Sequence, residues 1–164
     1  MQKVTIVIPN YNGRRLLENC LKTLENQTYT DFKVLIIDNG STDGSKEIIS
    51  DTLDMEMVSL ETNLGFCGAV NLGIQMTNTP YIILLNNDTE TDRYFVETLL
   101  KAIERSEKIF SCGAQMIDFQ NHKILDNAGD LYTAMGWAVA RGKGKRCIDY
   151  EKKKRVFSCC AGAA

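Results

Sequence analysis

At 164 residues and 44% hydrophobic content, the chain is long enough to bury the core of one domain of ordinary size. Its 19 basic and 21 acidic residues give a formal net charge of −2 without a dominant block of either sign, which argues against nucleic acid as the main partner. No apolar stretch approaches the ~18 to 20 residues of a membrane span, and the N-terminus does not resemble a signal peptide, so we expect a cytoplasmic protein.

The first predicted strand covers residues 3–9, which are rich in β-branched side chains and close with Pro9. The turn Asn10-Tyr11-Asn12-Gly13 follows. Apolar residues at helical spacing then predict an amphipathic helix from Arg14 to about Asn26. Its apolar positions are Leu16, Leu17, Cys20, Leu21 and Leu24.

The second predicted strand covers residues 32–37 and runs into the turn-forming residues 38–44. We expect a helix after this turn, with an apolar face made by Ile48, Ile49 and Leu53. A short third strand follows over residues 55–60. Small residues then predict a helix from Ala69 to about Met76 that packs closely on the sheet.

Residues 81–85 are five consecutive bulky apolar residues that follow Pro80. Because they leave no polar face, they predict a strand that is covered on both sides at the centre of a mostly parallel sheet. The ligand crevice of such a sheet lies beyond the carboxyl ends of its strands. Asn86-Asn87-Asp88 occupies that end of this strand.

The rest of the chain predicts a helix from Tyr94 to about Lys108 and a strand over residues 110–117, after which the pattern loosens. This alternation indicates a Rossmann-like α/β domain over residues 1–164, with a nucleotide-binding half of about 1–117 and an irregular second half of about 118–164. A strand pattern begins at Val156 and stops with the chain, so we expect the second half to be incomplete and the domain C-terminally truncated.

Three predicted strand ends carry polar side chains that should meet at one edge of the sheet. These are residues 9–12, Asp38-Asn39 and residues 86–88. Asn and Asp can hydrogen-bond to the edge of a base, and Tyr11 can stack on it. The alternatives are that residues 38–41 form only a turn with a helix cap, and that residues 86–88 form only a strand-to-helix loop.

The common glycine-rich phosphate loops are missing, since the first strand has no Gly-x-Gly-x-x-Gly after it and the chain has no Gly-x-x-x-x-Gly-Lys-Ser/Thr. Gly65-x-x-Gly68 alone is more often a packing feature than a phosphate loop. A nucleotide diphosphate would therefore need another counter-charge, which a metal held by a strand-end carboxylate can supply.

Five segments, in this order and spacing, resemble family-2 glycosyltransferases, especially their rhamnosyltransferase-like bacterial members. They are residues 7–13, 24–32, 37–45, 63–71 and 84–88, and they cover most of residues 3–115. The resemblance implies a glycosyltransferase A-type fold. It also implies inverting transfer of a hexose or deoxyhexose from a nucleotide-diphosphate sugar to a glycan or lipid-linked acceptor, as in polysaccharide biosynthesis.

By position, the resemblance places Pro9, Tyr11 and Asn39 around the base. Asp38 would support the turn or contact the base or ribose, and Gly68 is a further candidate for nucleotide-sugar binding.

The resemblance also places residues 86–88 at the family's Asp-x-Asp metal motif, of which only Asp88 keeps its carboxylate. Asp88 is then the candidate ligand of Mg²⁺ or Mn²⁺, and Asn87 would contact the ribose or a metal-bound water. The family's catalytic base lies further along than Ala164, so the catalytic residue is unknown.

Two other functions fit parts of the pattern. A non-catalytic nucleotide-sugar-binding module would explain the reduced metal motif and the missing base. A receiver-like signalling domain also has acids at strand ends, but it expects a carboxylate cluster after the first strand, where this chain has Asn10 and Asn12.

The remaining features have modest interpretations. We expect His122 to be a solvated turn residue, and Trp137 to pack in the core or stack on an acceptor sugar. The basic residues 141–146 and 152–155 favour a solvated loop over contact with a diphosphate or with lipid at the inner face of the membrane. Six cysteines without a Cys-x-x-Cys or zinc pattern indicate buried, reduced thiols.

Overall fold

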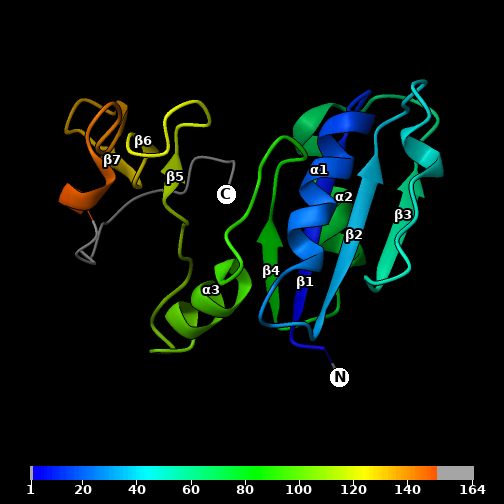
Figure 1. Cartoon of the computed structure of the whole chain (residues 1–164), viewed down its shortest axis with the longest axis horizontal. Coiled ribbons are helices and arrows are strands. Elements are labelled where there is room, and N and C mark those ends of the chain that lie inside the picture. Colours follow the sequence, from blue (N-terminus) through cyan, green and yellow to red (C-terminus); the bar gives the residue numbers. More distant parts are fainter. Residues whose placement is uncertain (1, 151–164) are drawn as a thin grey trace. The chain divides into compact units, whose positions relative to one another are not determined.

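The computed structural model describes residues 2–150 and is shown in Figure 1. The chain divides between Glu97 and Thr98 into two compact units. The strand predicted from Val156, the basic residues 152–155 and the cysteines at 159 and 160 lie outside the described residues.

The first unit is built on a four-stranded sheet in the order β3-β2-β1-β4. Its strands are β1 (Val4–Asn10), β2 (Phe32–Asp38), β3 (Met55–Ser59) and β4 (Tyr81–Leu84). Every neighbouring pair is parallel, so all four carboxyl ends lie at one edge of the sheet, as Figure 1 shows. This confirms the predicted parallel α/β architecture.

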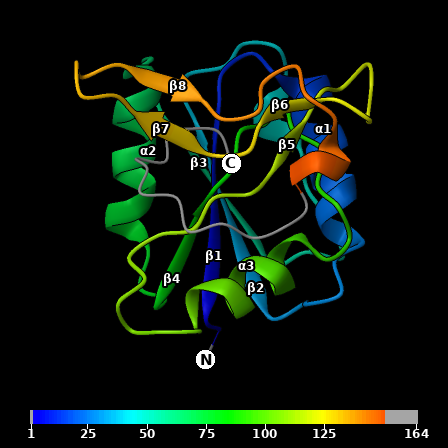
Figure 2. The ribbon, with the colours of Figure 1, turned by 90° about the vertical axis from the view of Figure 1, so that its left-hand side faces the viewer.

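Helices α1 (Arg14–Glu25) and α2 (Gly65–Met76) cover opposite faces of this sheet, as Figure 2 shows. Of the five apolar positions predicted for the inner face of α1, Leu17, Cys20, Leu21 and Leu24 are buried, whereas Leu16 is 49% exposed. The small residues of α2 allow the helix to pack closely on the sheet, as was expected. A Cβ atom on Gly73 would lie 2.4 Å from Cγ1 of Val7 in β1. The helix begins at Gly65, four residues before the predicted start at Ala69.

The helix predicted around Ile48, Ile49 and Leu53 was wrong. Only a 3₁₀ turn forms there, Ser45–Glu47, and Ile49 is 83% exposed. The hydroxyl of Ser50 accepts hydrogen bonds from the backbone N–H groups of Thr52 and Leu53. Such local bonds offer the backbone an alternative to a helix, and β-branched residues have low helix propensity.

Strand β4 was predicted at the centre of the sheet, but among the described residues it lies at the edge, with β1 as its neighbour. Ile83 is buried on one face. Ile82 and Leu84 point to the other face and are more than a third exposed. The continuous apolar run therefore indicates that β4 has apolar side chains on both faces of the sheet. It does not indicate that β4 has a neighbouring strand on each side.

The second unit begins within α3 (Phe95–Ile103) and continues with short strands. These are β5 (Met116–Ile117), β6 (Leu125–Asn127), β7 (Asp130–Tyr132) and β8 (Ala138–Ala140), followed by a 3₁₀ turn over Cys147–Tyr150. Strands β5 and β6 pair antiparallel, and so do β7 and β8.

Two elements of this unit are shorter than predicted. Helix α3 ends at Ile103, because the next residues, Glu104 to Lys108, are mostly polar and offer no apolar face. The strand predicted over residues 110–117 is reduced to β5, and Phe110 is 98% exposed. No helix within residues 2–150 is long and apolar enough to cross a membrane.

The side chains of the second unit agree only in part with the predictions. His122 lies in an exposed turn, as expected. The prediction that Trp137 packs in the core was wrong, because its side chain, just before β8, is 68% exposed. Residues 143–146 of the basic loop are exposed, as expected. At this surface Lys143 pairs with Asp126 at 3.1 Å, and the guanidinium of Arg141 lies over the ring of Tyr150.

Candidate functional site

The loops after β1, β2 and β4 meet at the carboxyl edge of the sheet. Asn10 and Asp38 end their strands in register, and the backbone N–H of Asn39 donates to the carbonyl of Asn10 at 2.7 Å. On the other side of β1, Leu85 N–H donates to the carbonyl of Val7 at 3.0 Å. The predicted convergence of the three strand ends is therefore present in the first unit.

One buried amide, that of Asn10, joins all three loops. Its Nδ2 donates to Oδ2 of Asp38 at 3.1 Å and to Oγ of Ser41 at 3.3 Å. Its Oδ1 accepts a hydrogen bond from Nδ2 of Asn87 at 2.7 Å. The sequence places Asn10 at this edge of the sheet but predicts no separate role for it. The signal for that role is a polar side chain at the last position of a buried strand, which needs hydrogen-bond partners.

Asp38 is fully buried, and its carboxylate holds the turn that follows β2. Its Oδ1 accepts from the backbone N–H of Ser41 at 3.0 Å, and its Oδ2 accepts from Asn10. Gly40, at φ +84°, makes the turn in a conformation that residues with a side chain rarely adopt. Asp38 was predicted either to support the turn or to contact the base or ribose. These hydrogen bonds support the turn.

Asn39, predicted beside the base, uses its side-chain amide within the protein. It is 4% exposed, and its Oδ1 accepts from the backbone N–H of Leu64 at 2.8 Å. Its Nδ2 donates to Oδ1 of Asn63 at 2.9 Å and to the carbonyl of Gly65 at 3.1 Å. Asn39 thus ties the end of β2 to the start of α2.

Three of the predicted residues are available to a ligand at this edge. Tyr11 is 52% exposed, Asn87 is half-buried and Asp88 is exposed. Within residues 2–150 the carboxylate of Asp88 makes no hydrogen bond or ion pair, in contrast to the buried carboxylate of Asp38. Pro9 is half-buried within β1, where it pairs in register with Ile37.

Gly68 lies in the first turns of α2 and is half-buried. A Cβ atom on it would lie 2.7 Å from Cβ of Leu64, in the turn before it. The space above Gly68 is therefore taken up by a side chain of the protein, which favours the packing interpretation of the Gly65-x-x-Gly68 pattern.

The donor set at this edge is a single free carboxylate. Within the described residues, no group of three or more His, Cys, Asp or Glu side chains is placed to hold a metal ion. A hard divalent cation accepts oxygens from carboxylates, amides, phosphates and water. Asp88 and Asn87 fit a partial shell of this kind, which a diphosphate ligand would have to complete.

Cys20 of α1 lies beneath the loop of residues 86–88. Its thiol is buried and lies 3.8 Å from the carbonyl oxygen of Asn86. Burial raises the pKa of the Cys20 thiol to about 11, and the nearby Asp88 carboxylate adds to the rise. Cys67, in contrast, is exposed, so the prediction of buried cysteines was wrong for this residue.

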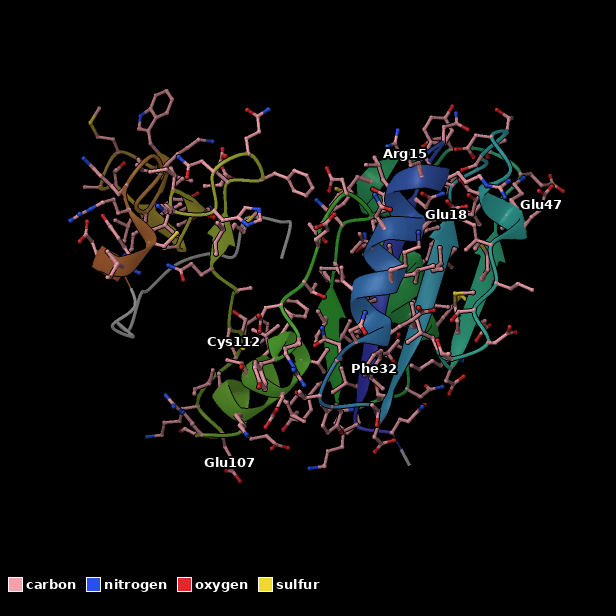
Figure 3. All side chains as sticks on the ribbon, viewed as in Figure 1. Arg15, Glu18, Phe32, Glu47, Glu107 and Cys112 are labelled. Atoms are coloured by element: carbon pink, nitrogen blue, oxygen red, sulfur yellow. The ribbon has the colours of Figure 1, made fainter. Side chains whose placement is uncertain are left out.

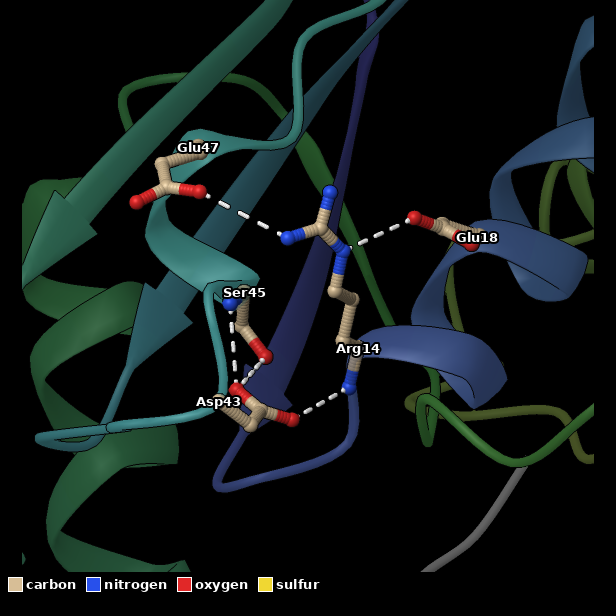
Figure 4. Close-up of polar contacts among 5 residues, drawn as sticks. All are labelled: Arg14, Glu18, Asp43, Ser45 and Glu47. Atoms are coloured by element: carbon tan, nitrogen blue, oxygen red, sulfur yellow. Dashed lines mark hydrogen bonds and ion pairs between the residues drawn. The ribbon is translucent and has the colours of Figure 1, made fainter.

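The start of α1 carries a second polar network, drawn in Figure 4. Arg14 donates its backbone N–H to Oδ2 of Asp43 at 2.8 Å, and its guanidinium reaches Glu18 at 3.2 Å and Glu47 at 3.5 Å. Ser45 donates both its hydroxyl and its backbone N–H to Asp43. The hydrogen bonds from Ser45 and Arg14 lower the pKa of Asp43 from its usual 3.8.

A shallow depression of about 500 Å³ lies beside this network. Arg15 projects from the first turn of α1 there, as Figure 3 shows, and its side chain is exposed. The depression is lined by Asn12, Gly13, Arg14, Arg15, Leu16, Glu18 and Asp43. Asp88 and Tyr11 do not line it, so it is a neighbour of the predicted site rather than the site itself.

The sequence profile described as "Glycosyl transferase family 2" matches residues 5–163. The amylovoran biosynthesis glycosyltransferase AmsB of Erwinia amylovora is 34% identical over 63% of this chain, which spans 36% of AmsB. Glycosyltransferase GlyA of Streptococcus pneumoniae is 32% identical over 62% of this chain and 15% of GlyA. The teichoic acid poly(glycerol phosphate) polymerase of Staphylococcus epidermidis is 27% identical over 68% of this chain and 16% of the polymerase.

Solved structures show the same fold. The mannosyltransferase PcManGT from Pyrobaculum calidifontis, in complex with GDP-Man and Mn²⁺, matches 65% of this chain and 33% of its own with a TM-score of 0.61 at 21% identity. S. aureus TarS in complex with UDP matches 74% of this chain and 40% of its own with a TM-score of 0.59 at 19% identity. The predicted glycosyltransferase A-type fold is confirmed. The chain spans well under half the length of each of these proteins.

Proposed function

Since the chain belongs to glycosyl transferase family 2, we propose that it binds a nucleotide-diphosphate sugar at the carboxyl edge of its sheet and transfers the sugar, with inversion, to a glycan or lipid-linked acceptor. One observation carries the proposal. Asp88 presents an exposed carboxylate without a hydrogen-bond or ion-pair partner in residues 2–150, next to the point where three strand-end loops are joined through Asn10.

The comparisons support this class of donor and acceptor. Proteins of the same fold are described in complex with UDP, UDP-GlcNAc and, together with Mn²⁺, GDP-Man. One relative is named as a teichoic acid poly(glycerol phosphate) polymerase and another as an amylovoran biosynthesis glycosyltransferase, which favours a polymeric acceptor. Transfer of a hexose or deoxyhexose, and a rhamnosyl donor in particular, stays a prediction.

Each residue at the edge has a proposed part. Asp88 and the side-chain oxygen of Asn87 face the diphosphate, and the exposed ring of Tyr11 packs against the base with Pro9 beneath it. Asp38 and Asn39 hold the loop in place through their buried hydrogen bonds. Mg²⁺ or Mn²⁺, when bound beside Asp88, would stabilise the negative charge that develops on the departing diphosphate.

A second candidate is a non-catalytic nucleotide-sugar-binding module. The observation that favours it is the single carboxylate in residues 86–88, where the family's motif has two. The two functions share the binding step and differ in turnover. Release of the nucleoside diphosphate from a nucleotide sugar, measured with and without acceptor glycans, separates them.

The binding step is tested by calorimetry with UDP, GDP and dTDP, with and without Mn²⁺, on the wild type and Asp88→Ala. Loss of a side chain that only supports a metal ligand typically costs 10- to 100-fold in metal affinity, so loss of Asp88 should weaken the Mn²⁺-dependent affinity by at least about tenfold. Glu90→Ala is the matched control, because it removes an exposed carboxylate two residues away. Binding that needs neither Mn²⁺ nor Asp88 would remove the role proposed for this residue.

A further inference from the structure

The buried amide of Asn10 has only one satisfactory orientation. Its Nδ2 faces Oδ2 of Asp38 and Oγ of Ser41. An ionised carboxylate can only accept hydrogen bonds, so a flipped amide would place Oδ1 of Asn10 against another acceptor. Asn10 and Asp38 are at most 2% exposed, so bulk water cannot offset that loss. Asp38 therefore fixes Asn10 with its Oδ1 pointing away from β2.

The orientation of Asn10 in turn fixes that of Asn87. Oδ1 of Asn10 requires a donor, and Nδ2 of Asn87 supplies it at 2.7 Å. This leaves Oδ1 of Asn87 on the opposite side of its amide. Within residues 2–150 nothing donates to this oxygen, and no buried side-chain nitrogen or oxygen lacks a partner. Oδ1 of Asn87 is therefore open to solvent.

We propose that Asp38, acting through Asn10, is a positioning residue that turns the carbonyl oxygen of Asn87 outward to solvent, on the same loop that carries the exposed carboxylate of Asp88. This inference rests on the proposed function, because it specifies what residues 87 and 88 offer to a diphosphate and its cation. In this orientation both side chains present oxygen, the ligand type that Mg²⁺ and Mn²⁺ take. In the reverse orientation Asn87 would present an NH₂ group, which repels a cation.

Gly13 leaves room for the hydrogen bond between Asn87 and Asn10. A Cβ atom there would lie 2.3 Å from Nδ2 of Asn87 and 2.8 Å from Oδ1 of Asn10. The φ angle of Gly13 is −119°, so its backbone does not require glycine and the requirement is one of space. In the Cβ direction Gly13 carries only a hydrogen, which points at the Asn87 amide group. This hydrogen makes the orientation of Asn87 measurable.

The first test is made by NMR on the chain without ligand. In the wild type, one Hα of Gly13 should give a strong NOE to the side-chain NH₂ protons of Asn87, whose signal is identified by its loss in Asn87→Asp. In Asp38→Asn the carboxylate no longer enforces the direction, so the amides can reverse and this NOE should weaken or vanish. Asn71→Asp, an exposed change on α2, is the control and should leave the NOE unchanged.

The second test measures the consequence for cations with pyrophosphate as the probe, which carries no base or sugar. Asp38→Asn should weaken Mn²⁺-dependent pyrophosphate binding several-fold and leave metal-free binding unchanged. An NOE that is absent from the wild type, or unchanged in Asp38→Asn, overturns the inference. Failure of the wild type to bind pyrophosphate with Mn²⁺ would instead overturn the proposed function, because the NOE is measured without ligand.

Discussion

Asp43 accepts a hydrogen bond from the backbone N–H of Arg14 at 2.8 Å, so a carboxylate from the loop after β2 caps the helix that follows β1. Helix α1 has no side-chain cap of its own, because its N-cap residue is Gly13. A negative charge at this position also interacts favourably with the helix dipole. The two loops are thereby held together at the rim of the candidate site.

This cap should make stability depend on pH. Because the pKa of Asp43 is lowered on folding, its contribution is fully present above its usual value of 3.8 and is lost as the pH falls through the lower folded value. Asp43→Asn should therefore lower the melting temperature at pH 7, and the difference from the wild type should narrow towards pH 3. Asp51→Asn, an exposed change in a neighbouring loop, is the control, and a difference that is constant with pH would contradict the prediction.

Gly13→Ala should destabilise the first unit through its clash with the Asn87 amide. Overpacking of this kind costs about 1 to 3 kcal/mol, which corresponds to a melting-temperature loss of roughly 2 to 10 °C for a chain of this size. In an Asn87→Ala background the nearest clashing atom is gone, so at least half of the loss should disappear. Equal losses in the two backgrounds would mean that Asn87 does not occupy the space above Gly13.

Gly73→Ala should also destabilise, although alanine is the better helix former by about 1 kcal/mol. The added Cβ would lie 2.4 Å from Cγ1 of Val7 and 3.3 Å from Cγ1 of Ile37, both in the buried sheet. The cost of overpacking should exceed the gain in propensity. Urea unfolding measures the net effect, and Val7→Ala combined with Gly73→Ala should be more stable than the sum of the single changes. Simple additivity would argue against close packing of α2 on β1.

Cys20 and Cys67 should differ strongly in reactivity. Cys20 is buried and its pKa is raised to about 11, so on the order of one thiol in a thousand is ionised at pH 8. Iodoacetamide followed by peptide mapping should label the exposed Cys67 within minutes and leave Cys20 unmodified until the chain is unfolded. Labelling of Cys20 at the rate of Cys67 would show that the helix and the loop above it separate in solution.

The sequence predicted the elements whose pattern has a direct physical cause. Residues 3–9 and 32–37 are rich in β-branched and other apolar side chains, and both form buried parallel strands. The apolar stripe from Leu17 to Leu24 marks the buried face of α1. The helix predicted around Ile48 and Ile49 does not form, because only Ile48 is buried and Ile49 is 83% exposed.

The sequence predicted where the candidate site lies, but it did not predict the hydrogen bonds within the site. Strand-end position indicated residues 9–12, 38–39 and 86–88, and the loops that carry them do meet. Some of these side chains are available to a ligand, and others are hydrogen-bonded within the protein. The difference depends on partners that lie far away in the sequence. Asn39 is held by residues 63–65, and Asn10 is held by residues 28 and 77 positions away, which spacing alone does not reveal.

The separation between Asn10 and its partners has a consequence for the order of folding. Closing chain segments of 28 and 77 residues is entropically costly, so contacts of this range form late, after local helices. A partly folded chain that has formed only β1 and α1 does not yet have the candidate site, because Asn87 has not yet formed its hydrogen bond to Asn10. Ligand recognition should therefore require the long-range contact between Asn10 and Asn87, and local helix formation alone should not produce it.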